Sequence, residues 1–210
     1  MTFLALAAQS PAFADSLTLV ALGDSLTQGY GLPPEDGFVP QLEGWLKAHG
    51  ADVVVMNAGV SGDTTAGGLA RTDWALVPET DALIVTLGGN DLLRGLPPSE
   101  ARANLDAILG KADARKIPVL LVGMPAPGNY GPAYKAEFDA IYPDLAARHG
   151  ALLAPDFLAP LRAAHDAGTP QEQLLQADGL HPTARGVALI VEALGPRVLE
   201  LLDKAKPAGG

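Results

Sequence analysis

The chain has 210 residues, of which 48% are hydrophobic and 18% charged, so it can bury one sizeable core and is too apolar to be disordered. Acidic residues outnumber basic ones by 24 to 14, and the resulting net charge of -10 argues against nucleic acid as a partner. The chain contains no cysteine, which excludes disulfides, thiolate catalysis and zinc–thiolate sites.

Residues 1–14 have the pattern of a truncated secretory signal peptide. An apolar segment at 3–8 is followed by Ala-Phe-Ala at 12–14, which has the small-x-small form of a signal peptidase cleavage site. No Lys or Arg precedes the apolar segment, so the usual charged beginning is missing, and the alternative is a frayed apolar tail. We expect a periplasmic or secreted protein with a mature domain at 15–203 and a flexible tail at 204–210.

Strands and helices alternate along the rest of the chain. Apolar and β-branched runs predict strands at 17–22, 53–56, 82–87, 117–122 and 151–153. Helical spacing and helix-end signals predict helices at 38–50, 65–77, 99–114, 133–149, 158–165 and 183–202. This alternation is typical of βαβ units with a parallel sheet. We therefore expect a three-layer α/β/α sandwich with a central parallel sheet of about five strands.

The stretch 23–29 (Gly-Asp-Ser-Leu-Thr-Gln-Gly) comes directly after the first predicted strand. Ligands bind at the carboxyl ends of the strands in an open α/β sheet, so Ser25 is a candidate nucleophile. The simpler interpretation is a helix N-terminus with Asp24 or Ser25 as its cap. The seven residues alone do not decide between the two.

A serine nucleophile needs a base, and the chain has four histidines. His49, His149 and His165 lie at or near predicted helix ends, where a structural role is sufficient. His181 lies just before the last predicted helix, three residues after Asp178. This carboxylate can accept the Nδ1 proton, so that Nε2 faces the serine as general base. The structural alternative is that Asp178 starts a loop and His181 binds a backbone carbonyl.

Acyl transfer also needs hydrogen-bond donors for the oxyanion. The candidates are the backbone N–H of Ser25, the loop glycine Gly62 and the side-chain amide of Asn90. They follow the first, second and third predicted strands, which places all three at the same edge of a parallel sheet. Gly62 could also be an ordinary turn glycine, and Asn90 a helix cap.

These residues resemble the motifs of the SGNH, or GDSL, hydrolase family. Four blocks carry the resemblance, in the family's order: Gly23–Leu26, Asn57–Thr64, Gly88–Asp91 and Asp178–Pro182. The resemblance implies a flavodoxin-like hydrolase fold. It also implies a catalytic role for Ser25, Asp178 and His181, and an oxyanion hole formed by Ser25, Gly62 and Asn90.

The chain is most similar to the bacterial thioesterase I and lysophospholipase branch of this family, which includes arylesterases. The similar stretches are Gly59–Arg71, Gly128–Gly131 and Phe138–Pro143. Members of that branch are commonly exported and hydrolyse a broad range of esters and thioesters. The resemblance therefore implies a serine esterase with a small-molecule acyl ester or thioester substrate. A carbohydrate O-acetylesterase and a non-catalytic acyl-ligand binding protein are the alternatives.

The Pro- and Gly-rich segment 123–134 is expected to line the acyl groove, with Met124, Pro125 and Tyr130 as its walls. A plain connecting loop is the alternative. The sequence has no His-Glu-x-x-His, no metal-ligand cluster and no P-loop, so we expect no metal and no cofactor. It has no apolar run long enough to span a bilayer, and we expect a monomer or weak oligomer without stable membrane insertion.

Overall fold

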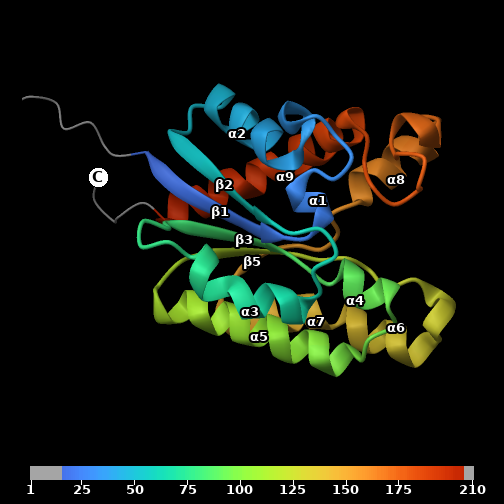
Figure 1. Ribbon diagram of the computed structural model, residues 1–210, viewed down its shortest axis with the longest axis horizontal. Coiled ribbons are helices and arrows are strands. Elements are labelled where there is room, and N and C mark those ends of the chain that lie inside the picture. Colours follow the sequence, from blue (N-terminus) through green and yellow to red (C-terminus); the bar gives the residue numbers. More distant parts are fainter. Residues whose placement is uncertain (1–15, 206–210) are drawn as a thin grey trace, which may run out of the picture.

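The computed structural model describes residues 16–205, so the predicted leader at 1–14 and most of the predicted tail lie outside the described residues. Its centre is a five-stranded parallel sheet with the order β2-β1-β3-β4-β5 (Figure 1). The strands are β1 (Leu17–Gly23), β2 (Val53–Gly59), β3 (Ala82–Thr86), β4 (Val119–Val122) and β5 (Leu152–Ala154). After β2 the chain crosses back over β1 to form β3, so the direction of winding reverses between β1 and β3. Such a switch point is where open α/β sheets form their ligand crevice.

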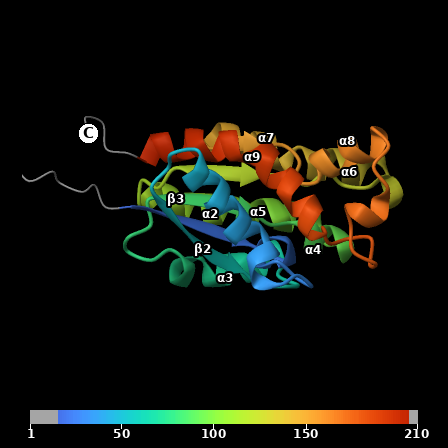
Figure 2. The same ribbon diagram turned by 90° about the horizontal axis from the view of Figure 1, so that it is seen from above.

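Helices cover both faces of the sheet, as Figure 1 and the view from above in Figure 2 show. One face carries α2 (Phe38–Ala48) and α9 (Ala184–Ala205), and the other carries α3 (Thr65–Ala75), α5 (Pro98–Ala114) and α7 (Ile141–His149). The remaining helices, α1 (Ser25–Gln28), α4 (Gly89–Leu93), α6 (Pro132–Asp139) and α8 (Ala159–Asp166), lie at the end of the molecule to which the strands point. The predicted three-layer fold is confirmed.

Strand β1 shows why the layers form. Its side chains alternate between two cores: Leu19 and Ala21 pack with residues of α2 and α9, while Val20 and Leu22 pack with residues of α3, α5 and α7. All four are at most 1% exposed. A strand segment buried on both faces must be apolar at every position, which explains the four consecutive apolar residues Leu19–Leu22.

The predicted helix at 133–149 is wrong in one respect, because two helices occupy this segment. Helix α6 ends at Asp139 and α7 begins at Ile141. Pro143 has no N–H to donate to the carbonyl of Asp139 four residues earlier, and its ring crowds that carbonyl. Pro143 is therefore a signal in the sequence for the break between α6 and α7.

The last helix also differs from its predicted end. Helix α9 runs to Ala205, beyond the predicted end at 202, and so Lys204 is helical rather than part of a tail. Within residues 16–205 no helix is long and apolar enough to cross a membrane.

Candidate active site

The carboxyl end of β1 turns sharply into α1 and thereby places Ser25. Asp24 caps this helix, and its Oδ1 accepts the N–H of Leu26 at 3.0 Å. A Cβ on Gly23 would collide with the side chain of Thr27 and lie 2.9 Å from the carbonyl oxygen of Thr86, so the turn requires glycine there. Asp24 is therefore the helix cap, and the hydroxyl of Ser25 lies at the carboxyl edge of the sheet, where the prediction of a nucleophile requires it.

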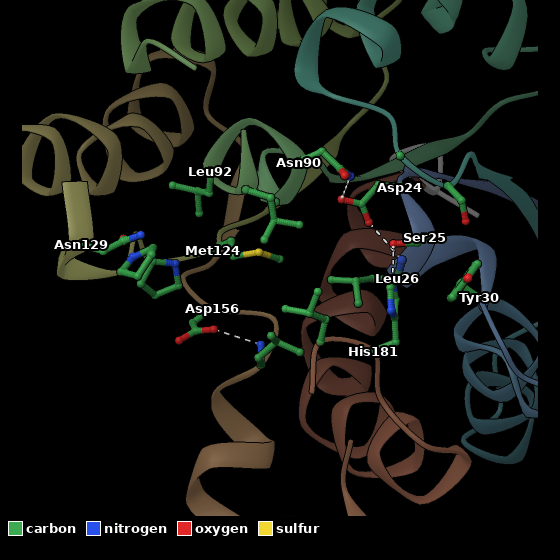
Figure 3. Close-up of a pocket in the computed structure, with 18 of the residues that line it drawn as sticks. Asp24, Ser25, Leu26, Tyr30, Asn90, Leu92, Met124, Asn129, Asp156 and His181 are labelled. Atoms are coloured by element: carbon green, nitrogen blue, oxygen red, sulfur yellow. Dashed lines mark hydrogen bonds between the residues drawn. The ribbon is translucent and has the colours of Figure 1, made fainter. Parts of the chain in front are cut away.

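Ser25, His181 and Asp178 form a continuous chain of hydrogen bonds. Nε2 of His181 lies 2.8 Å from Oγ of Ser25, and Nδ1 of His181 lies 2.6 Å from Oδ2 of Asp178 (Figure 3 shows Ser25 and His181). Oδ1 of Asp178 also accepts the backbone N–H groups of Leu180 and His181, at 2.9 and 3.0 Å. The backbone hydrogen bond from His181, together with those from its ring and from Leu180, lowers the pKa of Asp178 to about 2. The carboxylate is therefore ionised across the physiological range.

Two further contacts hold the His181 loop against the segment after α1. The rings of Tyr30 and His181 lie against one another, with centroids 4.7 Å apart and a tilt of 41°. The side-chain amide of Gln176 donates to the carbonyls of Tyr30 and Pro182, each at 2.9 Å. The loop that carries His181 is thus tied to the loop that follows Ser25.

Gly62 and Asn90 lie beside Ser25 in the wall of the same cavity. Gly62 adopts a φ of +83°, a left-handed conformation that favours glycine. The amide nitrogen of Asn90 donates to the carbonyl of Asp63 at 2.9 Å and, over a longer 3.3 Å, to Oδ2 of Asp24. Within residues 16–205, the N–H groups of Ser25 and Gly62 have no protein acceptor. The structure thus brings the three predicted oxyanion donors together, two of them free.

Polar side chains that the sequence did not reveal as part of the site support these loops. Arg71 of α3 donates to the carbonyls of Gly23 and Ala58, at the ends of β1 and β2, and to the carboxylate of Asp63. The buried carboxylate of Asp91 accepts the N–H and hydroxyl of Thr65, at 2.8 and 2.7 Å. A local sequence pattern does not identify such side chains, because most of their hydrogen-bond partners lie far away in the chain.

Asp24 is a second group whose environment the sequence did not reveal. It is 2% exposed, and burial raises its pKa to about 6, against the opposing effect of the hydrogen bond from Leu26 and the proximity of His181. Its carboxylate links the first turn of α1 to Asn90 (Figure 3). Asp24 therefore contacts both the helix that carries Ser25 and a predicted oxyanion donor.

The cavity beside Ser25 has a volume of about 530 Å³ and mostly apolar walls. Met124, Pro125 and Tyr130, the residues predicted for an acyl groove, are among those that line it. Side chains from the carboxyl-end loops of all five strands complete it, including Leu26, Tyr30, Ser61, Leu92, Leu93, Leu158, Arg162 and Leu180. A neutral, apolar group attached to a reactive carbonyl fits this site.

The other histidines have the structural surroundings expected of them. His49 stacks on Trp45 and contacts its carbonyl, and His165 contacts the carbonyl of Thr169. His149 lies between Asp106 and Asp113, whose hydrogen bonds raise its pKa despite the opposing effect of burial. Among the described residues, no group of three or more His, Asp or Glu side chains is arranged to hold a metal ion.

Comparison with known proteins shows to which family the chain belongs. The model of the GDSL-like lipase/acylhydrolase family matches residues 21–189, which include Ser25, Gly62, Asn90, Asp178 and His181. The chain belongs to this family. The protein is therefore an enzyme that hydrolyses ester bonds, and the predicted family membership is confirmed.

Three relatives show which branch of the family is similar. Esterase TesA of Pseudomonas aeruginosa is 39% identical over 88% of this chain and 89% of its own length. An arylesterase of Vibrio mimicus is 36% identical over 95% and 96%, and thioesterase 1/protease 1/lysophospholipase L1 of Escherichia coli K12 is 33% identical over 89% and 85%. Among solved structures, the SGNH-hydrolase family esterase AlinE4 is 46% identical, with a TM-score of 0.71 over 91% of this chain and 99% of that one.

Proposed function

We propose that the protein is a serine esterase that works through an acyl-enzyme on Ser25. The hydrogen-bonded chain from Ser25 through His181 to Asp178 supports this most directly. His181 takes the proton of the Ser25 hydroxyl as its Oγ attacks the substrate carbonyl. The ionised carboxylate of Asp178 holds the Nδ1 proton and stabilises the imidazolium that forms. Water then attacks the acyl-enzyme, with His181 again as the base.

We assign the oxyanion hole to the N–H groups of Ser25 and Gly62 and to the amide of Asn90. The first two have no competing protein acceptor among the described residues. Asn90 is already bound, but its 3.3 Å contact to Asp24 is long and is the bond that an oxyanion would replace. Its 2.9 Å bond to the carbonyl of Asp63 keeps the amide oriented during the exchange.

The position of His181 orients the substrate. The leaving oxygen or sulfur receives its proton from Nε2 of His181, so the leaving group lies beside the ring of Tyr30. Figure 3 shows Tyr30 on one side of Ser25, and Met124 and Asn129 on the other. The acyl group accordingly lies on the side of Met124, with Pro125 and Tyr130 as further walls.

The substrates are carboxylic esters and, by analogy with the thioesterase and lysophospholipase named among the relatives, thioesters and lysophospholipids. The apolar cavity favours acyl groups larger than acetyl, which argues against a carbohydrate O-acetylesterase. A panel of aryl ester, acyl-CoA, lysophospholipid and acetylated sugar separates these classes.

Replacing the nucleophile tests the mechanism. Ser25→Ala should lower kcat for p-nitrophenyl butyrate by about 10⁴-fold or more while leaving the fold intact, because the acyl-enzyme cannot form. Steady-state kinetics measures kcat, and circular dichroism shows whether the fold is intact. Turnover of the variant within tenfold of the parent enzyme would refute the assignment. A fluorophosphonate that labels the parent and not the variant excludes a binding protein without turnover.

We also propose that the protein is exported and acts in the periplasm or outside the cell. The support is the sequence of residues 1–14, which lie outside the described part of the chain. On this proposal the mature enzyme begins at Asp15. N-terminal sequencing of the protein from the cytoplasmic and periplasmic fractions of a bacterial host tests it, and protein that stays in the cytoplasm with Met1 intact would refute it.

A further inference from the structure

The loop between β2 and α3 carries Gly62, whose backbone N–H is one of the donors assigned to the oxyanion hole. The N–H of Asp63 donates to the carbonyl of Val60 at 3.1 Å, which closes a four-residue turn. Gly62, the third residue of this turn, has a φ of +83°, whereas Ser61 before it has a negative φ. This combination is the signature of a type II turn. The turn type sets the direction in which the Gly62 N–H points.

A type I turn is the competing conformation of the same four residues. The two types differ mainly in the orientation of the middle peptide, which here joins Ser61 to Gly62 and carries the Gly62 N–H. Rotation of this peptide toward type I would turn the N–H out of the oxyanion hole. Ser61 is exposed and Gly62 partly exposed, so the turn is not held by packing in the core. Its conformation depends on the contacts that neighbouring side chains make with it.

Two side chains make such contacts at consecutive residues of the turn. The hydroxyl of Ser61 donates to Oε1 of Gln28 in α1. The guanidinium of Arg94 donates to the carbonyl of Gly62 at 2.7 Å and is the single donor to that oxygen within residues 16–205. The same guanidinium nitrogen lies 3.7 Å from the position that a Cβ on Gly62 would occupy, so Arg94 covers the glycine directly.

Arg94 and Asn90 hold this loop from one short helix. Asn90 lies in α4, and Arg94 is the C-cap of α4, four residues later. Residues with this spacing lie on the same face of a helix. Arg94 binds the carbonyl of Gly62, while the amide of Asn90 binds the carbonyl of the next residue, Asp63, at 2.9 Å. The two proposed oxyanion donors Asn90 and Gly62 are thereby fixed relative to one another.

We propose that Arg94 is a positioning residue of the oxyanion hole, which holds the Gly62 N–H in the direction that the developing oxyanion requires. This proposal rests on the proposed function. Arg94 does not line the active-site cavity, so it acts through the backbone of Gly62. A displacement of about 1 Å in an active site can cost on the order of a hundredfold in rate. Because Arg94 is exposed, its replacement affects this geometry without opening the core.

Arg94→Met tests the proposal, because it removes the donor and keeps an unbranched side chain. We expect kcat for p-nitrophenyl butyrate to fall about tenfold with little change in KM, which is less than the effect of losing an oxyanion donor outright. The urea midpoint of unfolding should change little. Arg94→Lys should recover most of kcat, since a single ammonium can serve the single carbonyl that Arg94 binds.

A boronic acid separates the positioning role from a merely structural one. The Oγ of Ser25 forms a bond to the boron of 1-butaneboronic acid, its proton passes to His181, and one oxygen of the tetrahedral adduct occupies the oxyanion hole. The adduct resembles the transition state, so its inhibition constant in Arg94→Met should rise by the same factor as kcat/KM falls. Arg94→Lys should bring it back toward the parent value. A merely structural role would leave the inhibition constant of the folded protein unchanged.

Arg115→Met is the matched control. Arg115 also donates to backbone carbonyls of a loop, those of Leu76 and Val77, but this loop leads into the amino end of β3, away from the site. Its kcat and inhibition constant should equal those of the parent enzyme. Parent values of both quantities in Arg94→Met, or an equal change in Arg115→Met, would overturn the positioning role.

Failure of the proposed function gives a different result. If Ser25 is not the nucleophile, Ser25→Ala retains butyrate turnover and the boronic acid does not compete with the ester in the parent enzyme. If only the role of Arg94 is wrong, Ser25→Ala is inactive, the boronic acid inhibits the parent enzyme, and Arg94→Met behaves like the parent.

Discussion

At the scale of single residues, Asp24 connects the proposed nucleophile to the proposed oxyanion hole. One carboxylate oxygen accepts the N–H of Leu26 in the first turn of α1, and the other faces the amide of Asn90. The carboxylate is charged at neutral pH although it is only 2% exposed, so the enzyme carries a buried charge beside its active site. A buried charge of this kind lowers the stability of the folded state while it orders neighbouring donors.

This charge predicts a specific pH dependence of stability. The pKa of Asp24 is about 6 in the folded protein and 3.8 in the unfolded chain, so between these pH values the folded state binds the proton more tightly. The contribution of Asp24 to the free energy of unfolding therefore falls as the pH rises from 3.8 to 6 and is constant above that. Asp24→Asn removes this dependence. From pH 4 to pH 7.5, the stability of the variant relative to the parent should rise by about 1–3 kcal/mol in urea unfolding.

If the free energy of unfolding changes with pH in the same way in the parent and the variant, Asp24 does not titrate in this range. Activity gives a second readout. In Asp24→Asn an NH₂ group can face the NH₂ group of Asn90, so two donors oppose one another where a donor now meets a carboxylate. We expect a lower kcat with little change in KM, since the role proposed for Asn90 is to stabilise the transition state.

At the scale of elements, helix α3 stabilises the loops that follow β1 and β2 at the site. Through Arg71 it contacts the carbonyls of Gly23 in β1 and Ala58 in β2 and the carboxylate of Asp63, the residue after Gly62. The carbonyl of Asp63 in turn orients Asn90, which belongs to α4. The side chain of Arg71 is only 20% exposed, so these bonds form largely out of water.

Arg71→Met should therefore lower both stability and activity. It leaves two carbonyls and a carboxylate without their donor, which we expect to cost about 2–4 kcal/mol in the free energy of unfolding. Activity should fall as well, because Gly62 and Asn90 lose their support. Arg71→Lys should recover only part of each, because one ammonium cannot reach three acceptors as a guanidinium does. Urea unfolding and steady-state kinetics measure both.

Arg197 supplies the control for Arg71. It pairs with Glu200 on the surface of α9, and its side chain is 51% exposed. Arg197→Met should change stability by less than about 1 kcal/mol and leave kcat unchanged. If the two methionine variants behave alike, the role assigned to Arg71 is wrong.

At the scale of the whole molecule, the sheet topology assembles the site and the net charge affects what reaches it. The winding reversal between β1 and β3 brings Ser25 and His181, 156 residues apart in the chain, to a distance of 2.8 Å. The net charge of -10 repels anionic ligands from the molecule as a whole. Neutral esters approach unhindered, whereas acyl-CoA carries phosphate charges of the same sign as the enzyme.

Salt should therefore discriminate between these substrates. Raising the ionic strength from 10 mM to 200 mM shortens the screening length from about 30 Å to below 10 Å. We expect kcat/KM for an acyl-CoA to rise several-fold over this range, while kcat/KM for p-nitrophenyl butyrate changes little. A fall for the acyl-CoA would show that a local cationic site, and not the net charge, governs its approach.

The sequence by itself determined the fold and the residues of the proposed catalytic chain. Hydrophobic runs, helix-end glycines and the spacing of Asp178 and His181 are local patterns, and the alternation of strands and helices leaves few topologies open. The short helices α1 and α4 could be proposed only as alternatives, from capping residues, because four or five residues are too few to show a periodicity. The break between α6 and α7 had a local cause in Pro143, which periodicity alone did not weigh.

Only the tertiary structure decided the surroundings of the proposed catalytic residues. The link from Asp24 to Asn90 spans 66 residues, and the bond from Arg71 to Gly23 spans 48. The bond from Arg94 to the carbonyl of Gly62 spans 32. These features depend on how loops run over the edge of the sheet and on which long-range partners a buried polar group finds. Local propensity contains no information about either, because both follow from packing the whole chain around one sheet.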